Sequence, residues 1–203
     1  MNKFLNIYIF GDSLVLCDRL NLNQKWTKIL KSKIKKKNNK VNMSVRAING
    51  VTTTEALKKI NFKVNSKSIV LILFGANDSV YYKSKKGKPR TTLKLFFKNY
   101  VSIIKRIRSY DKKCKIFLLN GHKFYRRRLE GNKKTHNFSF IKYKNIIKVI
   151  AKKTQSEILD TYSFLLNYKP KKYCIKLPDG LHQNIFGSKK YSEIVYDKIN
   201  KYL

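Results

Sequence analysis

The sequence predicts an α/β fold in which a five-stranded parallel sheet is covered by helices on both faces. Two observations carry this prediction. Strand-like and helix-like segments alternate along all 203 residues, and the segment at 68–74 is continuously apolar after Ser68, as expected of a strand buried on both faces. No repeat or Pro/Gly-rich linker interrupts the pattern, so we expect one domain over residues 1–203.

Each element is predicted from its own pattern. Alternating or continuous apolar runs predict strands, and apolar residues three and four positions apart predict helices. Thr52 and Glu55 have the spacing of a capping box, which opens a short helix. In chain order we expect a strand at 3–10, a helix at 22–34, a strand at 41–48, a helix at 52–60, a strand at 68–74, a helix at 93–107, a strand at 115–120, a helix at 140–150, a strand at 158–160 and a helix at 188–202.

Targeting signals and cysteines are interpreted next. Residues 3–10 are expected to be a strand of the mature fold rather than a signal peptide, because no small-residue cleavage site follows them. The longest apolar run, 69–74, is too short to cross a bilayer. Cys17, Cys114 and Cys174 lack metal-ligand spacing, and their odd number leaves one thiol unpaired in any disulfide scheme. We therefore expect free thiols in a reducing, cytoplasmic location, with no metal or other cofactor.

The formal net charge of +36 is extreme for a chain of this length. Such a charge attracts anions, including nucleic acid, phospholipid head groups, acidic glycans and phosphorylated carriers. Drift of the genome toward AT-rich codons is the alternative, since Lys, Asn, Ile, Phe and Tyr are abundant together. Drift explains the excess of Lys better than the scarcity of Asp and Glu, and both explanations stay open.

Three polar side chains form a candidate catalytic set. Ser13 follows the first predicted strand, and Asp179 precedes His182 by three residues. A serine hydroxyl needs a base to become a nucleophile, and a carboxylate beside an imidazole holds the ring in one tautomer. We therefore predict Ser13 as the nucleophile, His182 as its base and Asp179 as the residue that orients His182.

Acyl transfer also needs hydrogen-bond donors for the oxyanion of the tetrahedral intermediate. The predicted donors follow the ends of the first three strands: the backbone N–H groups of Ser13 and Gly50 and the side-chain amide of Asn77. In an open parallel sheet these ends meet at one edge. Glycine at position 50 lets a substrate approach the backbone closely.

Four segments resemble the sequence blocks of the SGNH (GDSL-type) hydrolase superfamily, in the same order along the chain. They are Gly11-Asp12-Ser13, Gly50, Gly75-Ala76-Asn77-Asp78 and Asp179-Gly180-Leu181-His182. The resemblance extends from residue 9 to about residue 187. It implies a three-layer flavodoxin-like fold, metal-free hydrolysis of an ester or thioester, and the same roles for the triad and oxyanion residues. The chain departs from the family at Val51, where a second glycine is usual, so the loop after Gly50 is shortened.

Several residues also have a structural interpretation. Ser13 alone would be interpreted as a helix N-cap, Asp12 as support for its loop, and Asp78 as a turn former. The four blocks together favour the catalytic interpretation of Ser13. His122 and His136 lie in a polar, basic segment, where we expect them to be solvated.

Two basic loops, 81–90 and 121–128, follow the third and fourth strands and should emerge beside the catalytic residues. Arginines with interleaved aromatic residues suit phosphate, carboxylate or sugar groups. Arg126, Arg127 and Arg128 are therefore candidate substrate-binding residues for an anionic acylated glycan or lipid. Ordinary solvated loops are the alternative.

Two other functions stay open. A cationic protein that binds nucleic acid or another anionic polymer could carry a vestigial hydrolase site, although no nucleic-acid-binding motif is present. An acyltransferase could use the same triad. The acyl chain, the alcohol or thiol partner and the oligomeric state are left unspecified. Fluorophosphonate labelling separates an active hydrolase from the first alternative, and product analysis separates it from the second.

Overall fold

The computed structural model describes residues 5–82, 87–127 and 129–203, and its strands form one sheet in the order β2-β1-β3-β4-β5. The strands are β1 (Leu5–Gly11), β2 (Val41–Ala47), β3 (Ser68–Leu73), β4 (Lys115–Leu119) and β5 (Glu157–Leu159). Every pair of neighbours is parallel. This strand order is that of flavodoxin-like sheets, and the predicted fold class is confirmed.

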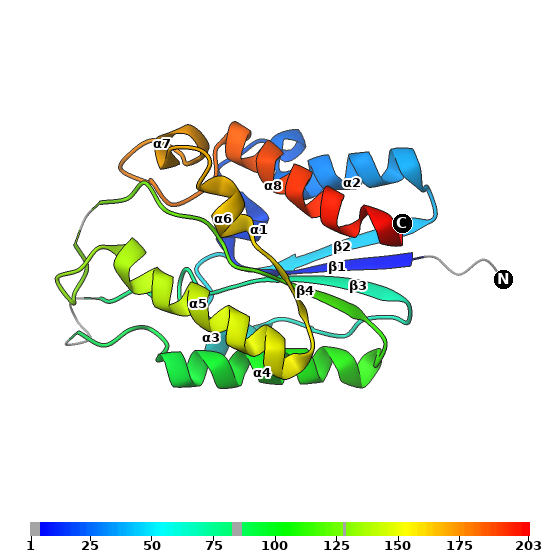
Figure 1. Ribbon diagram of the computed structural model, residues 1–203, viewed down its shortest axis with the longest axis horizontal. Coiled ribbons are helices and arrows are strands. Elements are labelled where there is room, and N and C mark those ends of the chain that lie inside the picture. The colour runs from blue at the N-terminus through cyan, green and yellow to red at the C-terminus, as the bar shows by residue number, and fades with distance from the viewer. Residues whose placement is uncertain (1–4, 83–86, 128) are drawn as a thin grey trace.

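Helices cover both faces of the sheet (Figure 1). One face carries α1 (Ser13–Leu16), α2 (Trp26–Lys37), α6 (Thr161–Leu165), α7 (Pro170–Tyr173) and α8 (Ile185–Ile199), and the other carries α3 (Thr53–Lys59), α4 (Leu93–Tyr110) and α5 (His136–Thr154). Short 3₁₀ helices at Leu22–Gln24 and Asn200–Tyr202 flank α2 and α8. Within the described ranges, no helix has the length and apolar character that a membrane span requires.

A hydrophobic core lies on each face because side chains of a strand alternate between its two sides. In β1, Ile7 and Ile9 belong to the core under α2 and α8, whereas Tyr8 and Phe10 belong to the core over α4. All six residues of β3 are buried. The central position of β3 therefore explains its continuous apolar sequence.

Short polar side chains set the helix starts. The Thr52 hydroxyl accepts a bond from the Glu55 backbone N–H, and the Glu55 carboxylate accepts one from the Thr52 N–H at 2.8 Å. The predicted capping box is thus confirmed. Thr135 caps α5, so this helix begins at His136, before the boundary expected from its apolar residues. The short helices α1, α6 and α7 were not predicted, because they span too few residues to show a helical period.

The expectation that His122 and His136 are solvated is wrong. His122 is 0% exposed and His136 is 1% exposed. The ring of His122 lies with Nδ1 2.9 Å from the Tyr191 hydroxyl and Nε2 2.9 Å from the Leu181 carbonyl oxygen. The basic residues around it in the sequence do not reveal this burial, because both partners come from distant segments.

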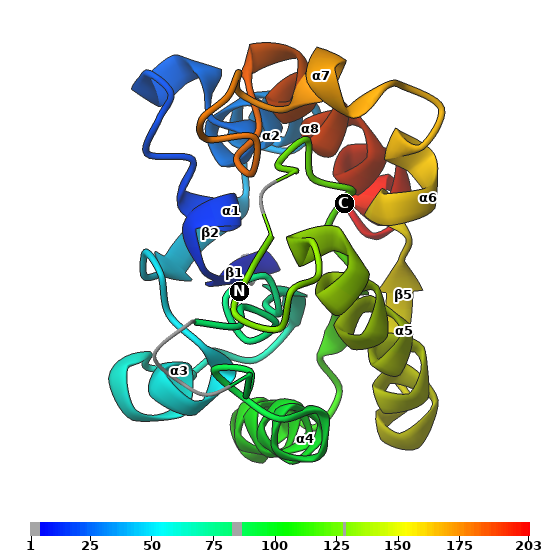
Figure 2. The same cartoon turned by 90° about the vertical axis from the view of Figure 1, so that its left-hand side faces the viewer.

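The strand register brings the strand ends together. Gly11 at the end of β1 lies opposite Ala47 of β2 and Leu73 of β3. The loops that follow these three strands therefore start at one edge of the sheet. Figure 2 looks onto this edge, with α1, α3 and α7 arranged around it.

Candidate active site

Three side chains from the two ends of the chain form a hydrogen-bonded relay. Ser13 Oγ lies 2.9 Å from His182 Nε2, and His182 Nδ1 lies 2.8 Å from Asp179 Oδ2. These are the three residues that the sequence indicated, and the structure brings them together across 169 positions. Each distance is within the range of a formed hydrogen bond.

The turn that carries Ser13 is anchored from two sides. Asp12, not Ser13, is the N-cap of α1, and its carboxylate accepts a 2.9 Å bond from the Leu14 N–H. The Ser13 hydroxyl is thus left for His182. The Leu14 carbonyl accepts bonds from Trp26 Nε1 at 3.0 Å and from Gln183 Nε2 at 3.2 Å. Because Gln183 directly follows His182, the bond from Gln183 links the turn that carries Ser13 to the segment that carries His182.

Asp179 is held as an anion by its own turn. Its Oδ1 accepts the backbone N–H groups of Leu181 at 2.8 Å and His182 at 2.9 Å, while Oδ2 faces the imidazole. Partial burial opposes ionisation, but these hydrogen bonds outweigh it and keep the pKa of Asp179 below its usual value. An ionised Asp179 keeps the Nδ1 proton in place and leaves Nε2 of a neutral ring able to accept a proton from Ser13.

A cavity of 440 Å³ opens beside Ser13. Its lining residues are Ser13, Asp18, Arg19, Asn49, Gly50, Asn77, Leu181 and His182. The three residues that were predicted to supply oxyanion donors therefore line one space, and Ser13 is one of them. Asp18, Arg19 and Asn49 were missed by sequence reasoning, because exposed polar residues in loops carry no signal of their own.

The Asn77 amide has a fixed orientation. Its Nδ2 donates a 3.1 Å hydrogen bond to Asp12 Oδ2, and because an ionised carboxylate can only accept, the amide nitrogen faces Asp12 when Asp12 is ionised. The second hydrogen on Nδ2 remains for a ligand in the cavity. Among the described residues, the backbone N–H groups of Ser13 and Gly50 also have no acceptor.

Asp12 is fully buried beneath this site. Burial and the nearby Asp78 carboxylate together raise its pKa to about 7, against the bonds from the Leu14 N–H and the Asn77 amide. A buried carboxylate with donors on both oxygens is a means of orienting Asn77. The expectation of a loop-supporting role for Asp12 agrees with these contacts.

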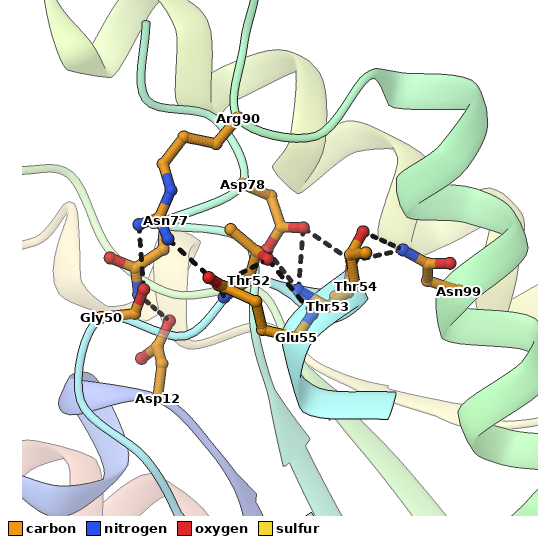
Figure 3. A network of polar contacts seen from close by, with 10 residues as sticks. All are labelled: Asp12, Gly50, Thr52, Thr53, Thr54, Glu55, Asn77, Asp78, Arg90 and Asn99. Carbon is orange, nitrogen blue, oxygen red and sulfur yellow. Dashed lines mark hydrogen bonds and ion pairs between the residues drawn. The ribbon is translucent and has the colours of Figure 1, made fainter. Parts of the chain in front are cut away.

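The loop after Gly50 is held by Arg90 (Figure 3). Arg90 Nη1 donates to the Gly50 carbonyl at 2.9 Å, and Nη2 donates to Glu55 Oε2 at 3.0 Å. Glu55 is the capping-box residue of α3, so one guanidinium joins the Gly50 loop to the start of that helix. The basic loop 81–90 was a candidate for substrate binding, but the Arg90 guanidinium bonds to residues of the protein itself.

Asp78 ties the Asn77 loop to two helices, as Figure 3 shows. Its buried carboxylate accepts the Thr53 N–H at 3.0 Å and the Thr53 hydroxyl at 2.6 Å. Asn99 of α4 in turn donates to the hydroxyls of Thr53 and Thr54. Burial raises the pKa of Asp78. Asp78, expected to form a turn, therefore also holds the Asn77 loop against α3 and α4.

A second serine–histidine contact lies in the core. Ser79 Oγ is 3.0 Å from His136 Nε2, but both groups also bond to the Ala76 carbonyl oxygen at 2.9 Å. A carbonyl only accepts, so the His136 Nε2 that contacts it carries a hydrogen and cannot take one from Ser79. Ser79 is 0% exposed, and neither residue lines the cavity at Ser13. This pair is structural.

Two of the three predicted arginines, Arg126 and Arg127, lie outside the Ser13 cavity. Arg126 Nε donates to the Asp179 carbonyl oxygen at 2.8 Å, and Arg126 and Arg127 line a separate cavity. Arg128 lies outside the described residues. The structure therefore does not bring Arg126 and Arg127 into the space that holds Ser13.

The sequence matches a known family over most of its length. The model of the GDSL-like lipase/acylhydrolase family covers residues 9–190, the span of the four blocks. The chain belongs to the GDSL-like lipase/acylhydrolase family. Its resemblance to GDSL-type hydrolases is thereby confirmed, and the protein is a serine hydrolase that acts on ester bonds.

Solved structures of GDSL-type and other esterases share the fold. The acetyl xylan esterase AlAXEase superposes with a TM-score of 0.72 at 17% identity, covering 96% of this chain and 100% of its own. The acetylxylan esterase Axe2 from Geobacillus stearothermophilus gives a TM-score of 0.72 at 16% identity, with 98% and 96% coverage. The esterase EstA from Pseudoalteromonas sp. gives 0.69 at 20% identity, with 97% coverage of both chains. No curated protein sequence matches the chain.

Proposed function

We propose that the protein hydrolyses a carboxylic ester or thioester through an acyl-enzyme on Ser13. The relay of 2.9 Å and 2.8 Å contacts from Ser13 through His182 to Asp179 is the observation that carries this proposal. His182 Nε2 takes the hydroxyl proton as Ser13 Oγ attacks the acyl carbonyl carbon, and Asp179 stabilises the imidazolium that forms. The same proton then passes to the departing alcohol or thiol, and water repeats the sequence to release the acid.

The oxyanion of each tetrahedral intermediate is proposed to bind the N–H groups of Ser13 and Gly50 and the Asn77 amide. All three residues line the cavity beside the nucleophile. The Asn77 amide is oriented by Asp12 and the Gly50 carbonyl is held by Arg90. Donors that are fixed before the reaction lower the barrier most, because they need no reorganisation as charge develops.

The cavity supports a small acyl group on a polar alcohol better than a long acyl chain. Leu181 supplies the one aliphatic side chain among its lining residues. Apart from Gly50, which has no side chain, the other lining residues are polar or charged. A long chain would need an extended apolar groove at this place. Two similar solved structures are acetyl xylan esterases. We therefore propose an acylated glycan, with an anionic character argued below, in preference to an acyl lipid.

A labelling and turnover experiment tests the catalytic assignment. Wild-type protein should cleave p-nitrophenyl acetate and react with a fluorophosphonate probe. Ser13→Ala should lose labelling, and Ser13→Ala and His182→Ala should each lose turnover by roughly 10³-fold or more. A matched control is Ser79→Ala, which removes the other serine hydroxyl that contacts a histidine. It should keep both labelling and turnover.

The proposal would be overturned if Ser13→Ala turned over the ester at the wild-type rate. Circular dichroism checks that Ser13→Ala and His182→Ala are folded. Comparing acetyl with dodecanoyl esters tests the acyl preference, and faster cleavage of the longer chain would contradict it. Adding an alcohol and identifying the products separates hydrolysis from acyl transfer.

A further inference from the structure

A second cavity, of 530 Å³, lies beside the loop that carries His182. We call it the cationic cavity, because its lining includes five basic residues and no acidic one. The basic residues are Lys123, Arg126, Arg127, Lys169 and Lys171. They come from the segment after β4 and from the start of α7, which Figure 2 shows at the edge of the sheet where the strands end. The volume is in the range of small-molecule sites.

Hydrogen bonds hold the walls of this cavity in place. The Asn137 side chain makes two 2.8 Å bonds with the backbone N–H and carbonyl of Phe124. The Tyr173 hydroxyl of α7 donates to the Lys123 carbonyl oxygen at 2.8 Å. The two segments that supply the charges are therefore joined before any ligand binds, which lowers the entropic cost of binding.

Most of the basic residues around the cavity have no ion-pair partner among the described residues. Apart from Arg126, whose Nε bonds to the Asp179 carbonyl, the basic residues of the cavity form no ion pair with any described residue. Arg127 lies over the Tyr125 ring, 6.0 Å from its centroid. Like charges gathered around one space repel each other, and an anion placed between them removes that repulsion.

The cationic cavity is joined directly to the relay. The Gly180 carbonyl accepts the N–H groups of Tyr125 at 2.7 Å and Arg126 at 3.0 Å, and Arg126 Nε bonds to the Asp179 carbonyl. Its wall and the turn that orients His182 are thus one hydrogen-bonded unit, on the His182 side of Ser13. The leaving alcohol lies on this side, because His182 gives it a proton.

We infer that the cationic cavity binds a phosphate or carboxylate group on the alcohol half of the ester. This inference rests on the proposed function, since it concerns the half of the substrate that leaves when Ser13 is acylated. The arginine fork pairs with two oxygens of either group, and the lysines add point charges. Lys169 and Lys171 were not indicated by the sequence, and they reach the cavity only through the packing of α7.

Three acetyl esters with one sugar scaffold test the inference: those of glucose, glucuronate and glucose 6-phosphate. At low ionic strength, wild-type kcat/KM should be higher for an anionic ester than for the neutral one. The variant Lys123→Gln/Lys171→Gln should lower this ratio roughly three- to tenfold. Its matched control is Lys105→Gln/Lys112→Gln, which removes two exposed lysines outside the cavity and changes net charge equally. The control should keep the wild-type ratio.

Each outcome decides for or against the cavity. Equal wild-type kcat/KM for neutral and anionic esters would overturn the inference and leave the proposed function standing. An equal fall in both double variants would also overturn it, because the whole surface and not the cavity would then attract the substrate. The preferred anionic ester identifies phosphate or carboxylate as the bound group.

Calorimetric titration with inorganic pyrophosphate tests the cavity without catalysis. Wild-type protein and the Lys105→Gln/Lys112→Gln control should bind it alike, and Lys123→Gln/Lys171→Gln should bind it several-fold more weakly. Failure of ester turnover and of fluorophosphonate labelling would refute the proposed function alone, whereas equal pyrophosphate affinities in all three proteins would refute the cationic site.

Discussion

Arg90 Nη1 donates a 2.9 Å hydrogen bond to the carbonyl oxygen of Gly50, whose N–H we propose as an oxyanion donor. Gly50 has a φ of +68° and no side chain to limit its rotation. Because Arg90 also pairs with Glu55 at the start of α3, it restrains the Gly50 peptide relative to a helix.

Removing this restraint should affect the chemical step more than binding. We expect Arg90→Ala to lower kcat roughly 10- to 100-fold with little change in KM, because a misplaced donor stabilises the transition state less. Arg90→Lys should restore part of kcat through a single bond. The control is Arg106→Ala, because Arg106 Nη1 also donates a 2.9 Å bond to a backbone carbonyl, that of Leu57. Equal kcat in Arg90→Ala and Arg106→Ala would contradict the prediction.

Asp12→Asn should reverse the Asn77 amide. The new side chain can still accept the Leu14 N–H, but its NH₂ group then faces the NH₂ group of Asn77, and two donors repel. Asn77 would then turn its oxygen toward the new NH₂ group and lose a donor to the oxyanion. We therefore expect kcat to fall about 10²-fold. Steady-state kinetics of Asp12→Asn, Asn77→Ala and the double variant measure the coupling. Additive effects of the two substitutions would show that Asp12 does not act through Asn77.

Two glycines with positive φ should respond differently to alanine. At Gly180 (φ +56°) a Cβ would lie 2.7 Å from the backbone nitrogen of Arg126, whereas at Gly50 it would meet nothing within 4 Å. We expect Gly50→Ala to lower the free energy of unfolding by about 1–2 kcal/mol, the cost of a left-handed alanine. Gly180→Ala should lose more, since backbone atoms must also move. Urea unfolding of both variants checks this, and equal losses would argue against the clash.

The buried His122 should make the free energy of unfolding depend on pH in the acid range. Burial lowers its pKa from 6.5 to about 4, so between these values the unfolded chain binds a proton that the native protein does not. The free energy of unfolding therefore falls as pH falls through this window, by about 1.4 kcal/mol per pH unit at most. His122→Gln should lose this contribution. Urea unfolding from pH 4.5 to 7 measures the slope, and an unchanged slope in His122→Gln would contradict the assignment.

The raised pKa of Asp12 should change the free energy of unfolding with pH in the opposite direction. Its pKa rises from 3.8 to about 7, so between these values the native protein binds the extra proton and becomes more stable as pH falls. The two contributions offset each other in the wild-type protein. Over the same pH range, Asp12→Asn should lose stability on acidification more steeply than wild type, and His122→Gln less steeply. Parallel pH curves for the two variants would show that neither group carries its shifted pKa.

Local pattern was sufficient for the elements and for much of the candidate site. Strand and helix periods depend on neighbours within a few positions, so the five strands and the long helices were predicted close to their observed bounds. Asp179 and His182 are also local partners, because one carboxylate accepts the N–H of a residue three positions later. Ser13 was found through its block and its place after a strand, and parallel strands end at a common edge for any such sequence.

Other features depend on contacts between distant segments. His122 was expected in solvent, yet its partners, Tyr191 and Leu181, come from the end of the chain. Arg90 belongs to a basic loop that was a candidate for substrate binding, and its side chain instead bonds to Gly50 and Glu55, which are distant in the sequence. Nothing within a few residues of either position reports such a partner.

The sequence by itself determined the class of fold, the identity of the candidate nucleophile and base, and the excess of positive charge. Only the tertiary structure decided which charges gather around one space. The cationic cavity combines the segment after β4 with the start of α7, and a shared backbone turn joins it to His182. The physical reason is that secondary structure follows short-range steric and hydrogen-bonding preferences, whereas a cavity is defined by the packing of segments that are far apart in the chain.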